Sequence, residues 1–338
     1  MKLSCSMAGL WPFQSQFKNR ILQSFHLFIL FSFFPPQLRR LYDIYGKDID
    51  GVIMCISPLF TIVLMLIKVG IIIRFQSKIK SLLCQIETEW ERTSRSEENK
   101  VVTTYASKTR EFCMIYAVIM SNVLICFIIS PTILPILDII LPKNETRMRY
   151  LAFELNYGID LQTYWFWLWL HTSLAGVVVI INVIATDTTY ITLILHCCYM
   201  FAIVRYRLEQ LDDSVKQDTI QPFENCDYNT VDTWKYKEQQ GKLQEQATAI
   251  KQCVLRHKKA IECAQILYHI FAWSLFAGAS INVIMISISA VQLVSKLSQW
   301  AQMTMACTYI SSELVHIFFL NLMAQYILDH SADVHESA

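Results

Sequence analysis

The chain has 338 residues, of which 54% are hydrophobic and 17% are charged, and its formal net charge is +1. Soluble proteins carry more charge, about a quarter of their residues, and nucleic-acid-binding domains are distinctly basic. The composition therefore disfavours both classes, and no nucleic-acid partner is expected. The apolar residues are gathered in long blocks, which is the pattern that membrane-spanning helices produce.

Six of these blocks are long enough to cross a bilayer, which takes about 20 apolar residues in a helix. In chain order they cover residues 21–38, 53–73, 113–137, 164–186, 263–291 and 300–328. Prolines disturb two of them: Pro35-Pro36 must end or kink the first, and Pro131 and Pro135 interrupt the third. The sequence predicts an all-α, polytopic membrane helix bundle that forms one domain over residues 1–338.

The fourth block continues beyond its membrane segment without a turn. Residues 188–204 are also uncharged, yet only Asp187 separates them from the preceding block. A helical hairpin needs a turn of a few residues, usually marked by Gly, Pro or Asn, and none stands there. We expect one helix from about Tyr164 to Leu211. At 1.5 Å per residue it is roughly 70 Å long, so part of it must extend into the cytoplasm.

Lysine and arginine are distributed unevenly between the segments that join the spans. With the N-terminus inside, the inner segments hold 21 of them and the outer segments hold 7, while Lys68 lies within a span. The positive-inside rule therefore predicts that both termini are cytoplasmic. No cleavage site follows the first apolar block, so no cleaved signal is expected. The sequon at Asn144 falls outside, and its glycosylation stays open because it lies close to the third span.

The two large inner segments carry apolar residues at helical spacing, which predicts amphipathic extensions of the membrane helices. In residues 76–110 and 235–262 the apolar positions are, respectively, Ile79, Leu82, Leu83 and Ile86, and Leu243, Ala247, Ile250, Val254 and Ile261. Residues 213–234 are the one segment expected to be flexible. The eleven cysteines show no CxxC and no regular spacing, so we expect buried thiols rather than disulfides or a zinc site.

Charge is costly inside a membrane and needs partners there, which concerns Lys68, Glu313 and His316 within the predicted spans and Asp187 just past the fourth. Lys68 is expected to extend its ammonium to the membrane interface. Asp187 can pair with a basic residue of a neighbouring helix. Glu313 and His316 share one helix face, and they either contact other helices or form a proton relay or half of a metal site. No Walker loop, GxSxG or HExxH is present, so no enzyme, cofactor or metal is expected.

The outward halves of spans two to six combine large apolar side chains with a few small or hydroxyl-bearing ones. This is the composition of a pocket for a small hydrophobic molecule, although ordinary helix packing would explain it as well. The candidate lining residues are Ser57, Phe60, Thr61, Met65, Met120, Ser121, Trp167, His171, Thr172, Ala175, Phe276 and Ser280. Of these, His171, Thr172 and Ser280 are the candidate polar contacts for a ligand.

Five strings, in this order, carry a resemblance to a known family. They are GLWP, FELNYGID, ATDTTYITLILHCCYMFAIVRYRLEQL, CVLRHKKAIECAQIL and YILDHSADVHESA. Together with their spacing and the predicted topology, these strings make the chain similar to an insect odorant receptor. The chain resembles a ligand-tuned subunit of this family over essentially its whole length. The resemblance implies an odorant-binding subunit of a ligand-gated, non-selective cation channel, a hetero-tetramer with a co-receptor in the plasma membrane of olfactory sensory neurons.

The resemblance also implies a pocket for a small volatile ligand between helices two to six, in the outer half of the lipid bilayer. The inner ends of the later helices would form an anchor between subunits. In the family a seventh, pore-lining helix follows the string that resembles YILDHSADVHESA, and this helix is not in the sequence. The alternatives are a gustatory receptor of the same superfamily and a truncated receptor that does not conduct. A transporter, a membrane enzyme and a G-protein-coupled receptor are disfavoured.

Overall fold

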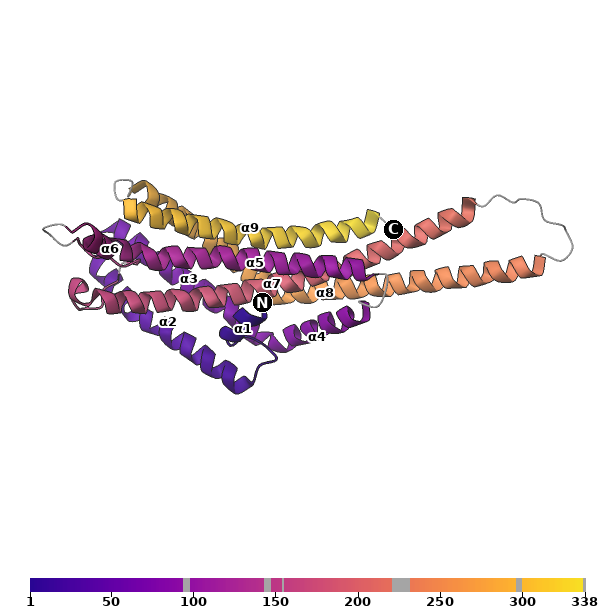
Figure 1. Ribbon diagram of the computed structural model, residues 1–338, viewed down its shortest axis with the longest axis horizontal. Helices are drawn as coiled ribbons and strands as arrows, with labels where there is room; N and C mark the ends of the chain where they lie inside the picture. Colours follow the sequence, from indigo (N-terminus) through magenta and orange to yellow (C-terminus); the bar gives the residue numbers. More distant parts are fainter. Residues whose placement is uncertain (94–97, 143–146, 154, 221–231, 296–299, 337–338) are drawn as a thin grey trace. The chain divides into compact units, whose positions relative to one another are not determined.

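The computed structural model describes all residues except 94–97, 143–146, 154, 221–231, 296–299 and 337–338. The described residues are mostly helical and include no strand, which confirms the predicted all-α class (Figure 1). The helices are α1 (Lys2–Met7), α2 (Gln16–Ile44), α3 (Ile49–Arg74), α4 (Gln76–Thr93), α5 (Asn99–Ile129), the 3₁₀ helix η1 (Ser130–Thr132), α6 (Ile133–Ile140), α7 (Leu161–Ile220), α8 (Asp232–Ser295) and α9 (Trp300–Glu336).

Six helical stretches of the described chain are long and apolar enough to cross a membrane, as the sequence predicts. They are Gln16–Ile44, Cys55–Arg74, Asn99–Ile140, Leu161–Asp213, Gln240–Val294 and Ala306–His335. The side of the membrane on which each end lies stays a prediction from the charge bias, and so does the single domain over residues 1–338.

The prolines act differently in the two spans that contain them. Helix α2 passes through Pro35 and Pro36 and ends at Ile44, so the alternative in which they end the helix is wrong. Neighbouring groups can satisfy the backbone acceptors that a proline leaves open inside a membrane helix. In the third span Pro131 stands in η1, which separates α5 from α6, and this confirms the predicted interruption.

Helix α7 has 60 residues, which corresponds to roughly 90 Å at 1.5 Å per residue. This confirms one continuous helix, and the helix continues nine residues beyond the predicted end at Leu211. Within the segment 213–234, residues 213–220 and 232–234 are helical, and the flexibility of the segment stays a prediction. Residues 221–231 lie outside the described part of the chain.

The chain divides into two compact units. Unit 1 comprises residues 1–84, 110–192 and 270–321, and unit 2 comprises residues 85–109, 193–269 and 322–338. The core of unit 1 joins α2, α3 and α7 through seven buried side chains, which are Ile29, Leu30, Phe33, Ile62, Met65, Ala175 and Val178.

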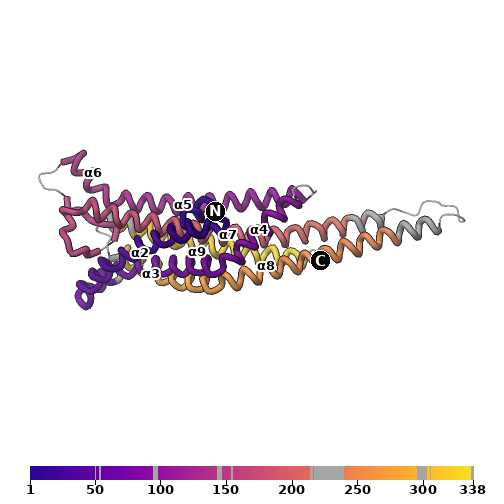
Figure 2. The backbone as a smooth tube through the Cα atoms, turned by 90° about the horizontal axis from the view of Figure 1, so that it is seen from below, coloured from indigo at the N-terminus to yellow at the C-terminus, as the bar shows by residue number. Residues whose placement is uncertain are grey.

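Other helices of unit 1 are held by specific contacts. Within this unit α5 and α9 run alongside each other (Figure 1). The ring centroids of Tyr116 and Phe319 lie 5.3 Å apart between them. Helix α1 packs against α7, where the Cys5 thiol donates to the carbonyl oxygen of Ala185 at 3.5 Å. Figures 1 and 2 both show the N-terminus over the helices of this bundle. The N-terminal segment is therefore part of the bundle.

Unit 2 is built around Tyr199 and Ile203 of α7, which pack on Val102 of α5. The Tyr199 hydroxyl donates to Thr93 Oγ1 at 3.2 Å. Glu98 accepts a hydrogen bond from Arg207 and lies 3.6 Å from Arg256. This buried carboxylate therefore joins the start of α5 to both α7 and α8.

The two predicted amphipathic segments have different outcomes. Of the four apolar positions predicted in α4, Ile79, Leu82 and Leu83 are buried, as expected, and Ile86 is half-buried. The predicted apolar positions of α8 are exposed instead, with Leu243, Ile250, Val254 and Ile261 at 59%, 52%, 62% and 40%. The buried positions there are those of Cys253 and Ala260. Small residues allow close helix approach, so the large apolar side chains face away from the contact.

Candidate functional site

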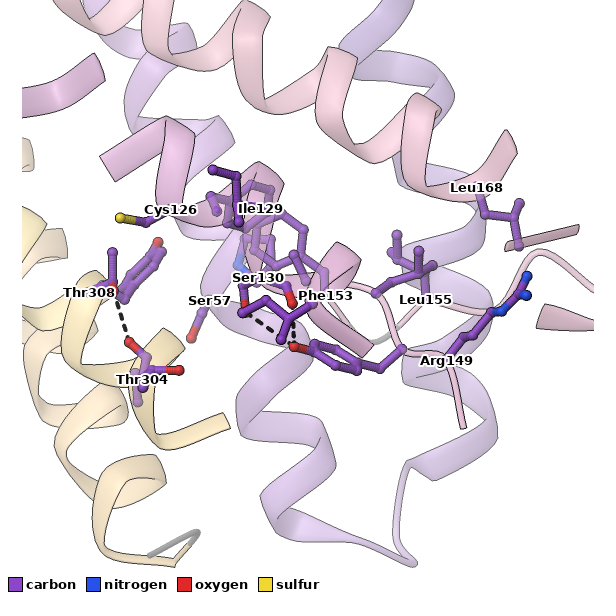
Figure 3. Close-up of a pocket in the computed structure, with 18 of the residues that line it drawn as sticks. Ser57, Cys126, Ile129, Ser130, Arg149, Phe153, Leu155, Leu168, Thr304 and Thr308 are labelled. Carbon is purple, nitrogen blue, oxygen red and sulfur yellow. Dashed lines mark hydrogen bonds between the residues drawn. The ribbon is translucent and has the colours of Figure 1, made fainter. Parts of the chain in front are cut away.

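A cavity of about 780 Å³ lies within unit 1 (Figure 3). Its walls come from α3, α5, α9 and the segment that precedes α7, and Figure 3 shows side chains of these elements around one space. Ser57 and Pro58 come from α3, Phe127 from α5, and Thr308 and Tyr309 from α9. This volume lies within the range of about 300–1,000 Å³ that small-molecule sites occupy.

Residues 149–153 and 155–159 form one side of the cavity and are held by several contacts. The Tyr150 hydroxyl donates to the carbonyl of Ser130 at 2.6 Å, and the Trp165 indole donates to the carbonyl of Tyr150 at 2.8 Å. The Phe153 ring lies 4.6 Å from that of Phe127 and 5.7 Å from that of Phe33. The aromatic side chains therefore anchor this segment to α2, α5 and α7.

The turn into α7 has the local structure that its sequence favours. Gly158 has φ = +74°, a conformation that glycine adopts readily, and its N–H donates to Asn156 Oδ1 at 2.8 Å. Asp160 Oδ2 then accepts from the N–H and hydroxyl of Thr163 at 2.8 and 2.6 Å, as a residue that caps a helix does. These hydrogen bonds lower the pKa of Asp160.

A second, smaller cavity of about 120 Å³ adjoins the first. The two cavities share five lining residues, which are Pro58, Val123, Phe127, Phe153 and Tyr309. Thr61, Ala175 and Glu313 line only the smaller one. A hydrogen bond between the hydroxyls of Thr61 and Tyr309 joins α3 to α9 at this point.

A buried polar network begins at Glu313 and extends away from the smaller cavity. Lys68 Nζ donates to Asp187 Oδ1 at 2.6 Å and to His316 Nε2 at 2.5 Å. The Tyr116 hydroxyl donates to Asp187 Oδ2 at 2.5 Å. The network thus joins α3, α5, α7 and α9 through polar groups that are almost entirely removed from the surface.

Asn282 of α8 links this network to the smaller cavity. Because the Lys68 ammonium can only donate, His316 Nε2 accepts and His316 Nδ1 carries the proton. With the Asn282 oxygen accepting from His316 Nδ1 at 2.8 Å, the Asn282 nitrogen donates to Glu313 Oε2 at 2.9 Å and to the carbonyl of Gly278 at 3.2 Å. This orientation satisfies both ends of the amide.

The sequence of residues 48–338 matches the family model described as 7tm Odorant receptor. The chain belongs to the 7tm odorant receptor family. This confirms the resemblance seen in the sequence strings, and it shows a multi-pass membrane protein of the receptor type. No curated protein sequence is similar enough to this receptor to match it.

Solved structures show the same fold. The insect olfactory receptor OR5 from Machilis hrabei matches this receptor with a TM-score of 0.69 at 13% identity. Its structure in complex with eugenol gives the same TM-score at 14% identity. In both comparisons the match covers 98% of this chain and 80% of the other chain. At this level of identity the likeness concerns the fold.

The receptor structure brings three of the twelve predicted pocket residues to the cavities, namely Ser57, Thr61 and Ala175. The other nine line neither cavity. Met65, Met120 and Thr172 are buried in helix packing, Phe60 and His171 are half-buried, and Ser121, Trp167, Phe276 and Ser280 are exposed. Helical spacing defines which residues share a face, but the bundle decides which face turns inward. Odorant contact by any of the twelve stays a prediction.

His171 illustrates the difference between a candidate ligand contact and a structural role. Its Nδ1 is hydrogen-bonded to the Tyr157 hydroxyl at 2.7 Å, and its Nε2 is hydrogen-bonded to the Ser32 hydroxyl at 2.8 Å. Burial raises the pKa of Tyr157, so this phenol keeps its proton. Both ring nitrogens of His171 are thus used to hold the segment before α7 against α2.

Sequence reasoning missed the largest part of the cavity wall. The missed residues include Phe127, Tyr150, Phe153, Thr308 and Tyr309. Tyr309 stands four residues before Glu313, and this helical spacing places the two on one face. The aromatic residues of the segment before α7 were a further signal, because a loop seldom carries so many apolar rings without burying them.

The ionisable residues within the spans give three outcomes. The predicted pairing of Asp187 with a basic residue of a neighbouring helix is confirmed. The expectation that Lys68 reaches the interface is wrong, because its side chain is only 6% exposed and is bonded inside the bundle. Glu313 and His316 face other helices. No residue group of the described chain has the geometry of a metal site, and the sequon at Asn144 lies outside the described residues.

Proposed function

We propose that this chain is the odorant-binding subunit of a ligand-gated, non-selective cation channel formed with a co-receptor. The observation that carries the proposal is the cavity of about 780 Å³ within the membrane-spanning part of a member of the odorant receptor family. Its walls include Val123, Phe127, Ile129, Phe153 and Leu155. Such walls bind a small hydrophobic molecule by burial, at about 25 cal/mol per Å² of apolar surface.

The gating mechanism follows from the position of the cavity between helices. A ligand shifts a conformational equilibrium only by its difference in affinity for the two states. Because the walls belong to α3, α5 and α9, a relative movement of these helices changes the cavity. A ligand that fits the open arrangement better therefore favours opening.

Association with other subunits is supported by unit 2. Its helix α8 exposes the apolar side chains of Leu243, Ile250, Val254 and Leu255. A stripe of this kind gains stability when another chain covers it. A co-receptor is the partner that we propose, in a hetero-tetramer located in the plasma membrane of olfactory sensory neurons.

Co-expression with a co-receptor, followed by recording of ligand-evoked cation current over a panel of volatile compounds, tests the proposal. We expect a current for a subset of compounds, and we expect Phe127→Ala to change the order of their potencies. The matched control is Phe318→Ala, because Phe318 is exposed on α9 and lines neither cavity. Binding of volatile compounds without any current would refute the channel role and retain the binding role.

A further inference from the structure

Glu313 places a carboxylate in the wall of the smaller cavity. Around it the wall is apolar or aromatic, apart from the hydroxyls of Thr61, Tyr309 and Ser312. The hydroxyls of Thr61 and Tyr309 are bonded to each other. Glu313 is thus the one residue among the described lining of this cavity that carries a carboxylate.

In the adjoining network the Lys68 ammonium donates its hydrogen bonds to groups other than the Glu313 carboxylate. Asp187 receives the Lys68 ammonium and the Tyr116 hydroxyl. His316 accepts from Lys68 and therefore adds no positive charge in this arrangement. One ammonium is shared among these groups, and its hydrogen bonds go to Asp187 and His316.

Among the residues that the structure describes, Glu313 is hydrogen-bonded only to the Asn282 amide, at 2.9 Å. A carboxylate has two oxygens with about four acceptor positions. Glu313 is half-buried, and the nearby Lys68 directs its hydrogen bonds to other groups. A partly desolvated carboxylate with one neutral hydrogen-bond partner gains when a further donor reaches it. The side of Glu313 that faces the cavity is where such a donor has room.

We infer that Glu313 selects ligands that carry a hydrogen-bond donor, a hydroxyl or an ammonium group, at one end of an apolar body. The inference rests on the proposed function, since it assumes that ligands enter these cavities. The donor end occupies the cavity of about 120 Å³ beside Glu313, and the apolar body extends into the larger one. Glu313 is therefore a specificity-determining residue.

The aromatic walls suit both kinds of donor. The rings of Phe33, Phe127, Phe153 and Tyr309 line the same small cavity, and ring faces attract cations. The hydrogen bonds between Glu313, Asn282 and His316 keep the carboxylate in place before a ligand arrives. A site arranged to hydrogen-bond a donor rejects analogues that lack it far more strongly than an apolar wall rejects a change in size.

The test uses the full chain purified in lipid nanodiscs, with ligand affinity measured by quenching of tryptophan fluorescence. The probes form three sets, which carry a hexyl, an octyl or a 2-phenylethyl group. Each set contains the alcohol, the primary amine and the methyl ether of that group. We expect the alcohol or the amine of at least one body to bind about tenfold or more tightly than its ether. In Glu313→Leu this difference should disappear, while the affinity of the ether stays the same or rises.

The conservative variant Glu313→Gln distinguishes alcohol ligands from amine ligands. It also provides a second test in case Glu313→Leu does not fold. Its amide oxygen can still accept from Asn282 and from an alcohol, so it should weaken the binding of amines more than that of alcohols. The matched control is Glu111→Gln, the same change at an exposed position of α5, which should leave all affinities unchanged.

Two results overturn the inference in distinguishable ways. If ethers bind as tightly as alcohols and amines, or if the difference persists in Glu313→Leu, Glu313 has no selective role and the proposed function is unaffected. If no compound of any set binds to the wild-type chain, the ligand site of the proposed function fails, and the inference fails with it.

Discussion

The Lys68 ammonium lies 2.6 Å from the Asp187 carboxylate, and both side chains are nearly enclosed between α3 and α7, at 6% and 5% exposure. Tyr116 and His316 supply further hydrogen bonds to the pair. Charged groups persist inside a membrane bundle only where such partners compensate the loss of water. The pair therefore joins two helices through residues that are 119 positions apart in the sequence.

Removal of one charge of this pair should destabilise unit 1. We expect Lys68→Met to lower the free energy of unfolding by about 3–5 kcal/mol, because Asp187 is left buried without its cation. The measurement is unfolding in detergent monitored by circular dichroism. Lys216→Met is the matched control, since Lys216 pairs with Asp212 at 2.5 Å on an exposed helix surface, where ion pairs contribute little.

Removal of both charges should lower the free energy of unfolding by less than the sum of the two single changes. In the variant Lys68→Met with Asp187→Leu no buried charge is left unpaired, so part of the stability should return. A double variant whose loss equals the sum of the single losses would show that the two groups are not coupled.

Ala175→Leu should alter ligand size selectivity. Ala175 lines the smaller cavity and is buried at 5% exposure, so a larger side chain there occupies ligand space. We expect the longest ligands to lose about tenfold or more in potency, while short ones change less. Dose–response curves over a homologous series measure this, and Ala279→Leu at an exposed position of α8 is the control. A uniform loss for all lengths would contradict the assignment.

Cys126 should report on access to the larger cavity. It lines that cavity and is exposed, so a bulky thiol reagent should attach there and reduce ligand responses. Prior addition of ligand should slow the reaction. Cys126→Ser should abolish the effect of the reagent, whereas Cys307→Ser should not, because Cys307 is exposed outside both cavities. Equal sensitivity of wild type and Cys126→Ser would place the reaction elsewhere.

Glu98→Gln should loosen unit 2. The Glu98 carboxylate, 11% exposed, accepts a hydrogen bond from Arg207 and forms an ion pair with Arg256. The neutral amide weakens both contacts by a total of about 1–3 kcal/mol. Amide hydrogen exchange in residues 99–109 should become faster. Glu209→Gln, which removes an exposed i,i+4 pair with Arg205, should leave the exchange rates nearly unchanged.

Some features of this protein were predictable because they depend on neighbouring residues. Long apolar runs indicated six spans, and the absence of any turn residue near Asp187 indicated one long helix through α7. The need of a buried charge for a partner indicated a pair at Asp187. In each case the requirement is local, either transfer of apolar side chains into lipid or compensation of a buried charge, and the residue types alone indicate it.

Other features depended on which helix faces meet, and only the tertiary structure decided them. The partner of Asp187 is Lys68, whose position within a span had indicated a side chain at the interface instead. Trp167 and Phe276 have the residue types of a pocket but are exposed, whereas Phe153 and Tyr309 were overlooked and line both cavities. The sequence by itself determined the helices, their order and their membrane character. The orientation of each helix about its axis, which arises from contacts between residues distant in sequence, decided the cavities, the polar network and the placement of Glu313 between them.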